Sequence, residues 1–270
     1  MGADAVWLLC VSVVLGVSVV SLLATVIAAR MVVRYRLNTI EDDKLPPVTI
    51  MKPLRGLDDE LDQNLRSFCE LDYPRFTLLF CLSDADDPAL KVVESLKAEF
   101  PAVSIKVSVS AEGTALNPKV RNLLNGLPQV EDELMLISDS NVRVEPGYLR
   151  DSVALLLSSE RIGLVSNMIV GTGERQPGAI YENLHMTGFV AGGVALTYAT
   201  GIMPVVVGKS MLMRRSALEA IGGLAAFGDF LAEDFMIGRE MDRAGFGVRL
   251  SGHVIQNVNR DWTLKRFASR

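Results

Sequence analysis

Residues 134–144 read "LMLISDSNVRV", an apolar run that stops on an acid. The first four residues are typical of a strand that is buried in a sheet. The polar sequence "SDSN" follows at once at 138–141 and contains Asp139 and Asn141. Because ligands bind beyond the carboxyl ends of the strands in open α/β sheets, the stretch predicts a buried strand that presents Asp139 to a ligand.

Apolar and amphipathic runs alternate on both sides of this stretch. Strands are predicted at "VTIM" (48–51), "FTLLFCLSD" (76–84), "SIKVSV" (104–109), "LMLISD" (134–139) and "GLVSNMIV" (163–170). Helical periodicity occurs in "DELDQNLRSFCE" (59–70), "DDPALKVVESLKAEF" (86–100) and "PGYLRDSVALLLSS" (146–159). The second of these helices is expected to begin at Pro88. The alternation predicts an α/β domain with a largely parallel sheet, complete before residue 250.

The N-terminal segment 5–29 contains no charged residue, which accounts for much of the mean hydropathy of +0.29. It is long enough to cross a bilayer core of roughly 30 Å. Arg30, Arg34 and Arg36 follow it, whereas Asp4 precedes it. By the positive-inside rule, 5–29 is a transmembrane anchor and the rest of the chain is cytoplasmic. Residues 30–47 are predicted to form a polar linker.

A second stretch without charge runs from 186 to 208. Its length allows a second membrane crossing, which would place the residues that follow it on the opposite side from Asp139. Glycines, a proline and threonines dilute its apolar content, however. We therefore expect a segment that faces lipid or lines a buried groove.

The overall composition argues against some classes of function. The net charge of -5 argues against a nucleic-acid-binding protein, which would normally show a basic face. Three cysteines and two histidines show no paired spacing such as C-x-x-C, so no Cys/His metal site is predicted.

Acids follow two of the predicted strands. Asp84, Asp86 and Asp87 follow one, and Asp139 with Asn141 follows another. Mg²⁺ or Mn²⁺ binds oxygen ligands and commonly takes one or two carboxylates plus substrate phosphates. Asp139 and Asn141 could supply such ligands, or Asp139 could cap a turn, whereas capping is the expected role of Asp86 and Asp87.

A third acid pair, Glu233-Asp234, is predicted to open a helix, where acids also complement the helix dipole. Three basic residues, Lys52, Arg55 and Lys119, could meet phosphate, although a solvated surface position is their default interpretation.

Six segments resemble, in the same order, the ceramide glucosyltransferase family and its bacterial relatives, which include hopanoid-associated glycosyltransferases. They are "MKPLRGLD", "LDYPRFTLLFCLSDADDPA", "LNPKVRNL", "ISDSNVRV", "GKSMLMRRSALEAIGGL" and "LAEDFMIGREM", between about residues 48 and 240. The family has an N-terminal membrane helix before a GT-A domain, which the resemblance implies at 48–270 with a mostly parallel sheet.

The resemblance implies an inverting transferase that moves a sugar from UDP-glucose or UDP-N-acetylglucosamine to the hydroxyl group of a ceramide or hopanoid. Asp84 matches the family's uridine-contacting acid, and Asp139 matches the acid that binds the metal and diphosphate. Asp234 matches the general base. Lys119 is implied to bind the donor, and Asn141 to assist Asp139 with Mg²⁺ or Mn²⁺. The implied location is a membrane, such as a bacterial inner membrane, with the catalytic domain in the cytoplasm.

The family's closing signature, Arg or Gln-x-x-Arg-Trp, is not complete. "QNVNRDW" (256–262) has a different spacing, and Arg270 matches only the first residue of the signature. We therefore expect the GT-A domain to be truncated at its C-terminal end. Two other interpretations stay open: a processive polysaccharide synthase of the same fold, and a non-catalytic membrane scaffold.

Overall fold

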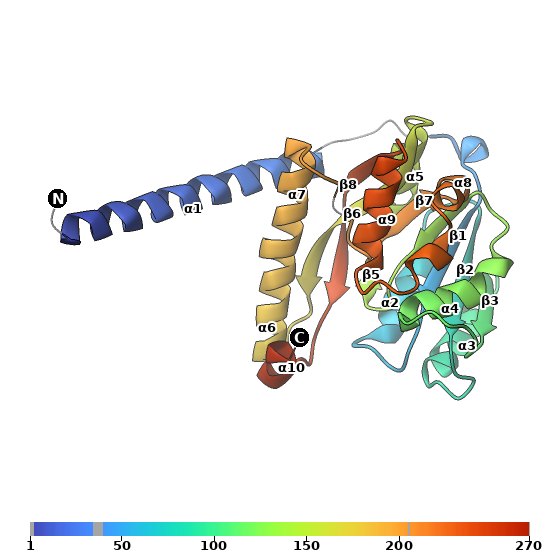
Figure 1. Cartoon of the computed structure of the whole chain (residues 1–270). Coiled ribbons are helices and arrows are strands. Elements are labelled where there is room, and N and C mark those ends of the chain that lie inside the picture. The colour runs from blue at the N-terminus through green and yellow to red at the C-terminus, as the bar shows by residue number, and fades with distance from the viewer. Residues whose placement is uncertain (1–2, 35–39, 205, 270) are drawn as a thin grey trace.

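The computed structural model describes residues 3–34, 40–204 and 206–269. Its strands are β1 (Val48–Pro53), β2 (Phe76–Leu82), β3 (Ser104–Val109), β4 (Leu134–Ile137), β5 (Val142–Arg143), β6 (Ile162–Thr172), β7 (Met211–Arg214) and β8 (Gly247–Val258). They form one sheet in the order β3-β2-β1-β4-β7-β6-β8-β5 (Figure 1). Four of the seven strand pairings among the described residues are parallel, which agrees with the predicted mostly parallel sheet.

The helices complete an α/β architecture. They are α1 (Ala3–Arg34), α2 (Leu61–Cys69), α3 (Ala89–Glu99), α4 (Pro118–Gly126), α5 (Tyr148–Leu157), α6 (Pro177–Leu184), α7 (Ala191–Thr200), α8 (Arg215–Ala220), α9 (Glu233–Arg243) and α10 (Leu264–Ala268). A π-helix, η3 (His185–Val190), joins α6 to α7, and short 3-10 helices lie at η1 (Asp42–Lys44), η2 (Leu127–Gln129) and η4 (Leu224–Phe227).

The parallel half of the sheet is the part that the sequence predicts. In β1, Ile50 pairs with Leu78 of β2 and with Leu136 of β4. All three side chains are fully buried, as expected of central parallel strands, which read as continuous apolar runs. The carboxyl ends of β1, β2 and β4 therefore meet at one edge of the sheet, where Asp139 lies.

The second half of the sheet differs from the prediction. Strand β7 runs antiparallel to both β4 and β6, and β5 runs antiparallel to β8. The expectation that the sheet is complete before residue 250 is wrong, because β8 continues to Val258. Arg249, Ser251 and Gln256 interrupt the apolar pattern of β8, so its sequence does not resemble a buried parallel strand.

Two apolar cores cover the two faces of the sheet, because successive side chains of a strand point to opposite faces. Leu78 and Phe80 of β2 join one core, and Leu79 and Cys81 join the other. The first core contains residues of α2, α3 and α5, and the second contains residues of α4, α8 and α9.

Strands β2 and β4 end before the acids that were predicted to close them. Strand β2 ends at Leu82, because the backbone N–H of Asp86 donates to the carboxylate of Asp84 in a turn. Helix α3 begins at Ala89 rather than at Pro88, and the Asp87 carboxylate accepts from the Ala89 N–H. These contacts of Asp84 and Asp87 account for the one- to two-residue differences at the end of β2 and the start of α3.

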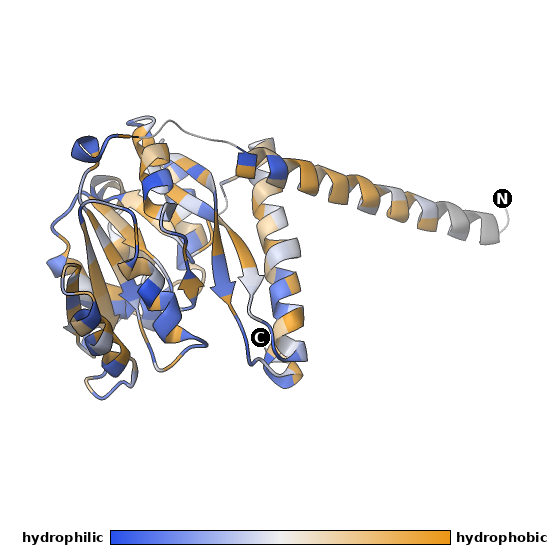
Figure 2. Cartoon of the chain, turned by 180° about the vertical axis from the view of Figure 1, so that it is seen from behind, coloured by the Kyte–Doolittle hydropathy of each residue, from blue (hydrophilic) through white to orange (hydrophobic). Residues whose placement is uncertain are grey.

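Helix α1 leaves the domain and exposes a long apolar surface (Figure 2). Its segment Val11–Arg34 is long and apolar enough to cross a membrane, which agrees with the predicted N-terminal span. Only its C-terminal part packs on the domain, where Ala28 and Val32 are buried. Residues 35–39 of the predicted linker, including Arg36, lie outside the described residues, as does Arg270.

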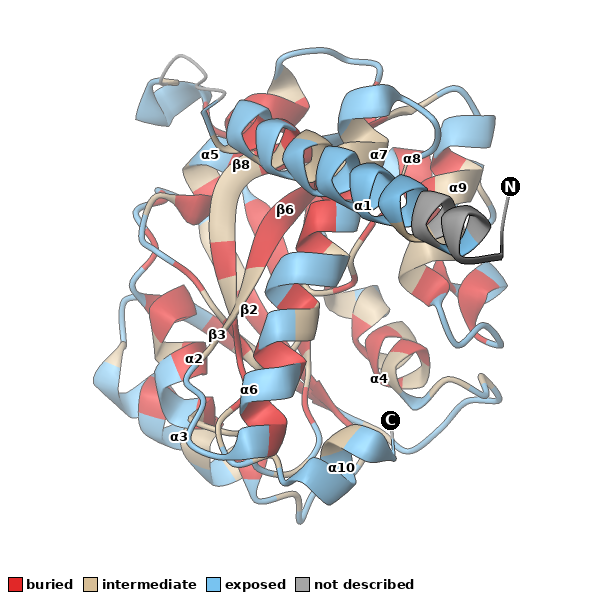
Figure 3. Ribbon diagram, turned by 90° about the vertical axis from the view of Figure 1, so that its left-hand side faces the viewer, coloured by how far each residue is buried: buried red, intermediate tan, exposed pale blue. Residues whose placement is uncertain are grey.

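The second uncharged stretch, 186–208, includes most of η3 and all of α7, which continue from α6 as one helical segment. This segment crosses the side of the domain from which α1 leaves (Figure 3). In the part of the chain that the structure describes, only Val11–Arg34 is long and apolar enough to be a candidate span. Helix α7 packs against α1 and against strands β6 and β8, and part of its surface is exposed.

Candidate active site

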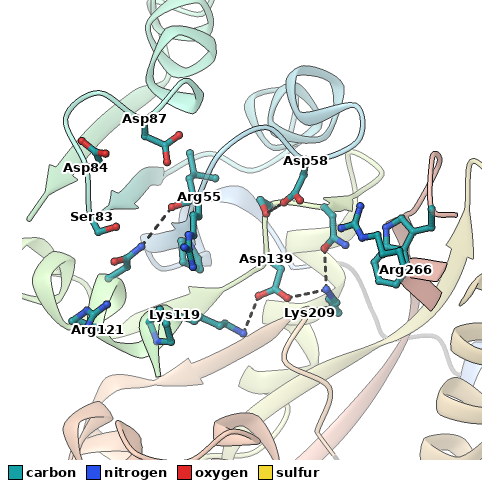
Figure 4. A pocket seen from close by; sticks show the side chains of 17 residues that line it. Arg55, Asp58, Ser83, Asp84, Asp87, Lys119, Arg121, Asp139, Lys209 and Arg266 are labelled. Carbon is teal, nitrogen blue, oxygen red and sulfur yellow. Dashed lines mark hydrogen bonds and ion pairs between the residues drawn. The ribbon is translucent and has the colours of Figure 1, made fainter. Parts of the chain in front are cut away.

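A polar pocket of about 570 Å³ lies at the carboxyl ends of β1, β2 and β4 (Figure 4). Its size lies within the range of small-molecule sites. The charged residues that line it come from segments far apart in the sequence: Arg55, Asp58, Asp84, Asp87, Lys119, Arg121, Asp139, Lys209 and Arg266. The predicted Asp84, Lys119, Asp139 and Asn141 therefore share one pocket.

Asp139 is held between two lysines. Its carboxylate oxygens lie 2.8 Å from Nζ of Lys119 and 2.9 Å from Nζ of Lys209. Burial alone would raise the pKa of Asp139, but the two ammonium groups hold it well below its usual range. Asp139 is therefore ionised at any physiological pH. Lys209 also donates to the side-chain oxygen of Asn141, at 2.9 Å.

Lys119 connects Asp139 to the acid pair at the start of α9. Its Nζ atom lies 2.9 Å from a carboxylate oxygen of Glu233. Burial lowers the pKa of Lys119, but the carboxylates of Asp139 and Glu233 outweigh this effect and raise it. Asn117 caps α4 by accepting from the backbone N–H of Lys119, and its side-chain amide donates to Glu233. Lys119 is thus a charged, positioned residue, and the default of a solvated surface lysine is wrong.

Asp234 lies next to this pair, beyond Lys119 rather than among the residues that line the pocket. Its carboxylate accepts from the backbone N–H of Gly208 at 2.6 Å and from that of Phe235 at 2.8 Å. Burial raises its pKa above the ordinary value of 3.8. A side chain at Gly208 would place a Cβ atom 2.8 Å from the Asp234 carboxylate and 3.1 Å from Nζ of Lys119, so a larger residue would displace both of these groups.

The three acids after β2 have different environments. Asp84 and Asp87 line the pocket, whereas Asp86 is exposed and does not. Asp87 accepts from the backbone N–H groups of Gly56 and Ala89, as expected of a capping residue. Its carboxylate therefore holds the loop after β1 against the start of α3.

Lys52 of β1 also contradicts the expectation of a solvated surface lysine, because it is fully buried. Its ammonium group donates to the backbone oxygen of Asp139 at 2.9 Å and lies 3.5 Å from the centre of the Phe68 ring. Burial lowers the pKa of Lys52 well below its usual value. Lys52 thus supports the loop that carries Asp139. Arg55 is exposed and lines the pocket.

Sequence reasoning missed several residues of the pocket. Lys209 directly follows the uncharged stretch 186–208, and Trp262 and Arg266 lie beyond the last predicted helix. The guanidinium of Arg266 stacks 4.3 Å from the Trp262 ring centre. A basic residue directly after a long uncharged stretch was the available signal for Lys209, but only the fold brings it to Asp139.

Asp139 and its neighbours supply the pocket with oxygen donors that a metal ion could use. In residues 3–34, 40–204 and 206–269, no three His, Cys, Asp or Glu residues are grouped so that they could hold a metal ion. Asp139 and Asn141 offer a carboxylate and an amide oxygen, and Lys209 contacts both side chains. This donor set fits a hard divalent cation that binds together with substrate phosphates, in competition with Lys209.

The sequence matches the family model described as glycosyl transferase family 21 over residues 13–270. Among characterised proteins, it is 32% identical to ceramide glucosyltransferase 3 of Caenorhabditis elegans over 239 residues, which cover 88% of this chain and 52% of that protein. It is 30% identical to the ceramide glucosyltransferase of Komagataella phaffii over 193 residues, which cover 64% of this chain and 38% of that protein. The chain thus spans about half, or less, of the length of these relatives.

Several solved structures share the fold. The mannosyltransferase PcManGT of Pyrobaculum calidifontis, in complex with GDP-Man and Mn²⁺, matches with a TM-score of 0.60 and 19% identity, over 91% of this chain and 67% of that chain. TarS residues 1–349 of S. aureus, in complex with UDP-GlcNAc, match with a TM-score of 0.56 and 16% identity, over 83% and 61% of the two chains. The predicted GT-A fold is thereby confirmed.

Proposed function

This chain belongs to glycosyl transferase family 21, and we propose that it transfers a sugar from a UDP-sugar to the hydroxyl group of a membrane lipid. The observation that carries the proposal is the position of Asp139 between Lys119 and Lys209, at the carboxyl ends of the strands. This pocket offers both cationic groups and a carboxylate to a diphosphate and its cation. The ceramide glucosyltransferases among its relatives support a lipid acceptor.

The donor is proposed to bind along the pocket. Asp84 at its outer end would contact the uridine, because a carboxylate accepts hydrogen bonds from a base or ribose. Lys119 and Lys209 would contact the diphosphate as ammonium donors. Asp139, with Asn141, would hold a Mg²⁺ or Mn²⁺ ion, which when bound offsets the negative charge of the departing diphosphate.

The acceptor hydroxyl is proposed to react at the side of Asp234. The Asp234 carboxylate takes the hydroxyl proton as the acceptor oxygen forms its bond to the anomeric carbon. The bond from that carbon to the diphosphate breaks, and UDP leaves with the electron pair. A single displacement of this kind inverts the configuration at the anomeric carbon. The raised pKa of Asp234, caused by burial, makes the carboxylate a stronger base than an ordinary aspartate.

The two candidate pairs of substrates are UDP-glucose with ceramide and UDP-N-acetylglucosamine with a hopanoid. The names of the two relatives favour the first pair. Because the chain spans about half the length of the relative from C. elegans, the activity of the whole protein is part of the proposal.

The apolar helix Val11–Arg34 is proposed to anchor the domain on the cytoplasmic side of a membrane. Arg30 and Arg34 at its C-terminal end favour this orientation. A reporter domain fused after residue 45 should be active only in the cytoplasm, and activity only outside it would contradict the orientation. A bacterial inner membrane stays a prediction.

Nucleotide binding tests the proposed donor site. We expect the chain to bind UDP more tightly than GDP in the presence of Mg²⁺, and Asp84→Asn to reduce this preference. Asp86→Asn is the matched control, because Asp86 follows the same strand but does not line the pocket. Equal affinity for UDP and GDP, or equal effects of the two substitutions, would contradict the assignment of Asp84.

A further inference from the structure

The helical segment 177–200, formed by α6, η3 and α7 and here called the crosswise helix, has one face without charge. Between Pro177 and Met203 the sequence contains only one Asp, Glu, Lys or Arg, which is Glu182. The Glu182 side chain is buried against the domain, with an exposed fraction of 2%. The outer face of the segment therefore presents no charged side chain to its surroundings.

Large apolar side chains instead occupy this face at helical spacing. Ile180, Leu184 and Phe189 are 47%, 64% and 76% exposed, and Ile202, directly after the helix, is 76% exposed. A soluble surface helix normally carries charged residues on the face away from the core. Ile180, Leu184 and Tyr181, which is 54% exposed, lie together on α6, and exposed apolar patches mark interaction sites, either for proteins or for membranes.

The geometry of α1 distinguishes between these partners. Helix α1 packs on α7 so closely that a Cβ atom at Gly192 would lie 2.6 Å from the Thr25 side chain. The crosswise helix runs across the direction of α1, along the side of the domain from which α1 leaves (Figure 1). Figure 3 looks onto this side: α1 passes in front of the upper part of the domain, and α6, with exposed residues, lies below it toward α10.

A bilayer that α1 crosses would meet the crosswise helix directly. If α1 runs along the membrane normal, a helix that runs across it on the same side lies in the plane of the membrane surface. The outer face of such an in-plane helix is buried at the boundary between headgroups and acyl chains, where apolar side chains are stable. The observed composition of the outer face agrees with this environment.

Basic and aromatic side chains gather where the crosswise helix begins. Helix α10 packs there, with the rings of Tyr181 and Phe267 stacked 5.7 Å apart. Lys265 and Arg266 on α10 are exposed, and basic residues at this position would face anionic headgroups. Arg266 also lines the pocket, so this end of the helix lies beside the candidate active site.

We propose that the outer face of the crosswise helix lies in the bilayer interface and seats the domain on the membrane, with the pocket mouth beside the lipid. This inference rests on the proposed membrane anchor and extends it, because it adds a second contact between the domain and the bilayer to the one made by α1. A lipid acceptor would then reach the pocket laterally, past α10, without leaving the membrane.

Environment-sensitive fluorescence measures the position of the outer face. The full chain carries a single NBD label on a cysteine at Leu184 or Phe189, with Cys10 replaced by alanine, whereas Cys69 and Cys81 are buried and remain. The protein is reconstituted in phosphatidylcholine–phosphatidylglycerol vesicles. We expect blue-shifted emission, quenching by nitroxide-labelled lipids and a loss of quenching by aqueous iodide at both positions.

Two control positions separate this inference from the proposed anchor. A label at Glu94, exposed on α3, should be quenched by iodide and not by the labelled lipids. A label at Val17 in α1 should be quenched by the labelled lipids alone. Iodide quenching at Leu184 and Phe189 equal to that at Glu94 would overturn the inference. The quenching of the Val17 label would then decide separately whether α1 is a membrane anchor. Labels at Leu184 and Phe189 that neither quencher reaches would also overturn it, because a second copy or another protein segment would then cover the face.

Discussion

The Nζ atom of Lys119 lies 2.8 Å from a carboxylate oxygen of Asp139 and so joins α4 to the loop after β4. The same ammonium group lies 2.9 Å from Glu233, the residue before Asp234. The proposed metal and diphosphate acid and the proposed general base are therefore positioned around one lysine. Substitutions of the two acids should nevertheless have different effects, because one acts on the donor and the other on the acceptor.

Asp139→Asn should weaken UDP binding in the presence of Mg²⁺ or Mn²⁺. Loss of a residue that only hydrogen-bonds to a metal ligand already costs about 10–100-fold in metal affinity. Loss of a ligand such as Asp139 should therefore cost at least as much. Isothermal titration of UDP, with and without EDTA, measures the effect. Asp86→Asn is the control at an exposed acid outside the pocket. Affinities that are equal in wild type and Asp139→Asn and insensitive to EDTA would contradict the assignment.

Asp234→Asn should reduce the turnover rate by about 10²–10⁴-fold and leave the affinity for UDP-sugar nearly unchanged, because a general base acts on the acceptor's proton. Transfer rates at saturating donor, together with donor titrations, separate the two effects. Asp242→Asn provides a matched control on the same helix, since Asp242 is exposed. A parallel loss of donor affinity and turnover in Asp234→Asn would instead assign Asp234 to the donor site.

The pH dependence of turnover should report the raised pKa of Asp234. Burial disfavours its charged form, so the carboxyl group stays protonated to a higher pH than an ordinary aspartate. A base acts only when it is deprotonated, and the acid limb of the kcat profile should therefore fall above pH 3.8. Initial rates measured at saturating substrate concentrations, at intervals of about one pH unit between roughly pH 4 and pH 8, resolve this limb. A rate that shows no decline on the acid side would argue against Asp234 as the base.

Lys209→Met should increase the affinity of the nucleotide-free protein for Mn²⁺. Lys209 contacts both Asp139 and Asn141, and a cation must compete with its ammonium group. The gain should be about fivefold, which corresponds to an ion pair of ~1 kcal/mol. Electron paramagnetic resonance of free Mn²⁺ measures it, with Lys91→Met, exposed on α3, as the control. Unchanged or weaker Mn²⁺ binding in Lys209→Met would show that the ion does not share the position of Lys209.

The parallel half of the sheet and the acids beside it could be predicted from the sequence because their signals are local. Four consecutive buried residues in β4, followed two positions later by Asp139, are enough to place an acid at the sheet's edge. The start of α9 at Glu233 was likewise predicted from its own residues.

The antiparallel strands and the lysine contacts could not be predicted in the same way. Strand β8 mixes polar and apolar residues, because it lies between β6 and the short strand β5 and follows an irregular register. The pairing of Asp139 with Lys209 joins residues that are remote in sequence, and it exists only because β7 lies beside β4. The full burial of Lys52 depends in the same way on the packing of α2, through Phe68.

The proposed lipid glycosylation is tested most directly by mass spectrometry of lipids from cells that express the chain, compared with cells that express the Asp139→Asn/Asp234→Asn double variant at a matched level. We expect a lipid that carries one added sugar in the first cells and is absent from the second. Identical lipid profiles in the two, or an equal amount of the glycosylated lipid in both, would contradict it.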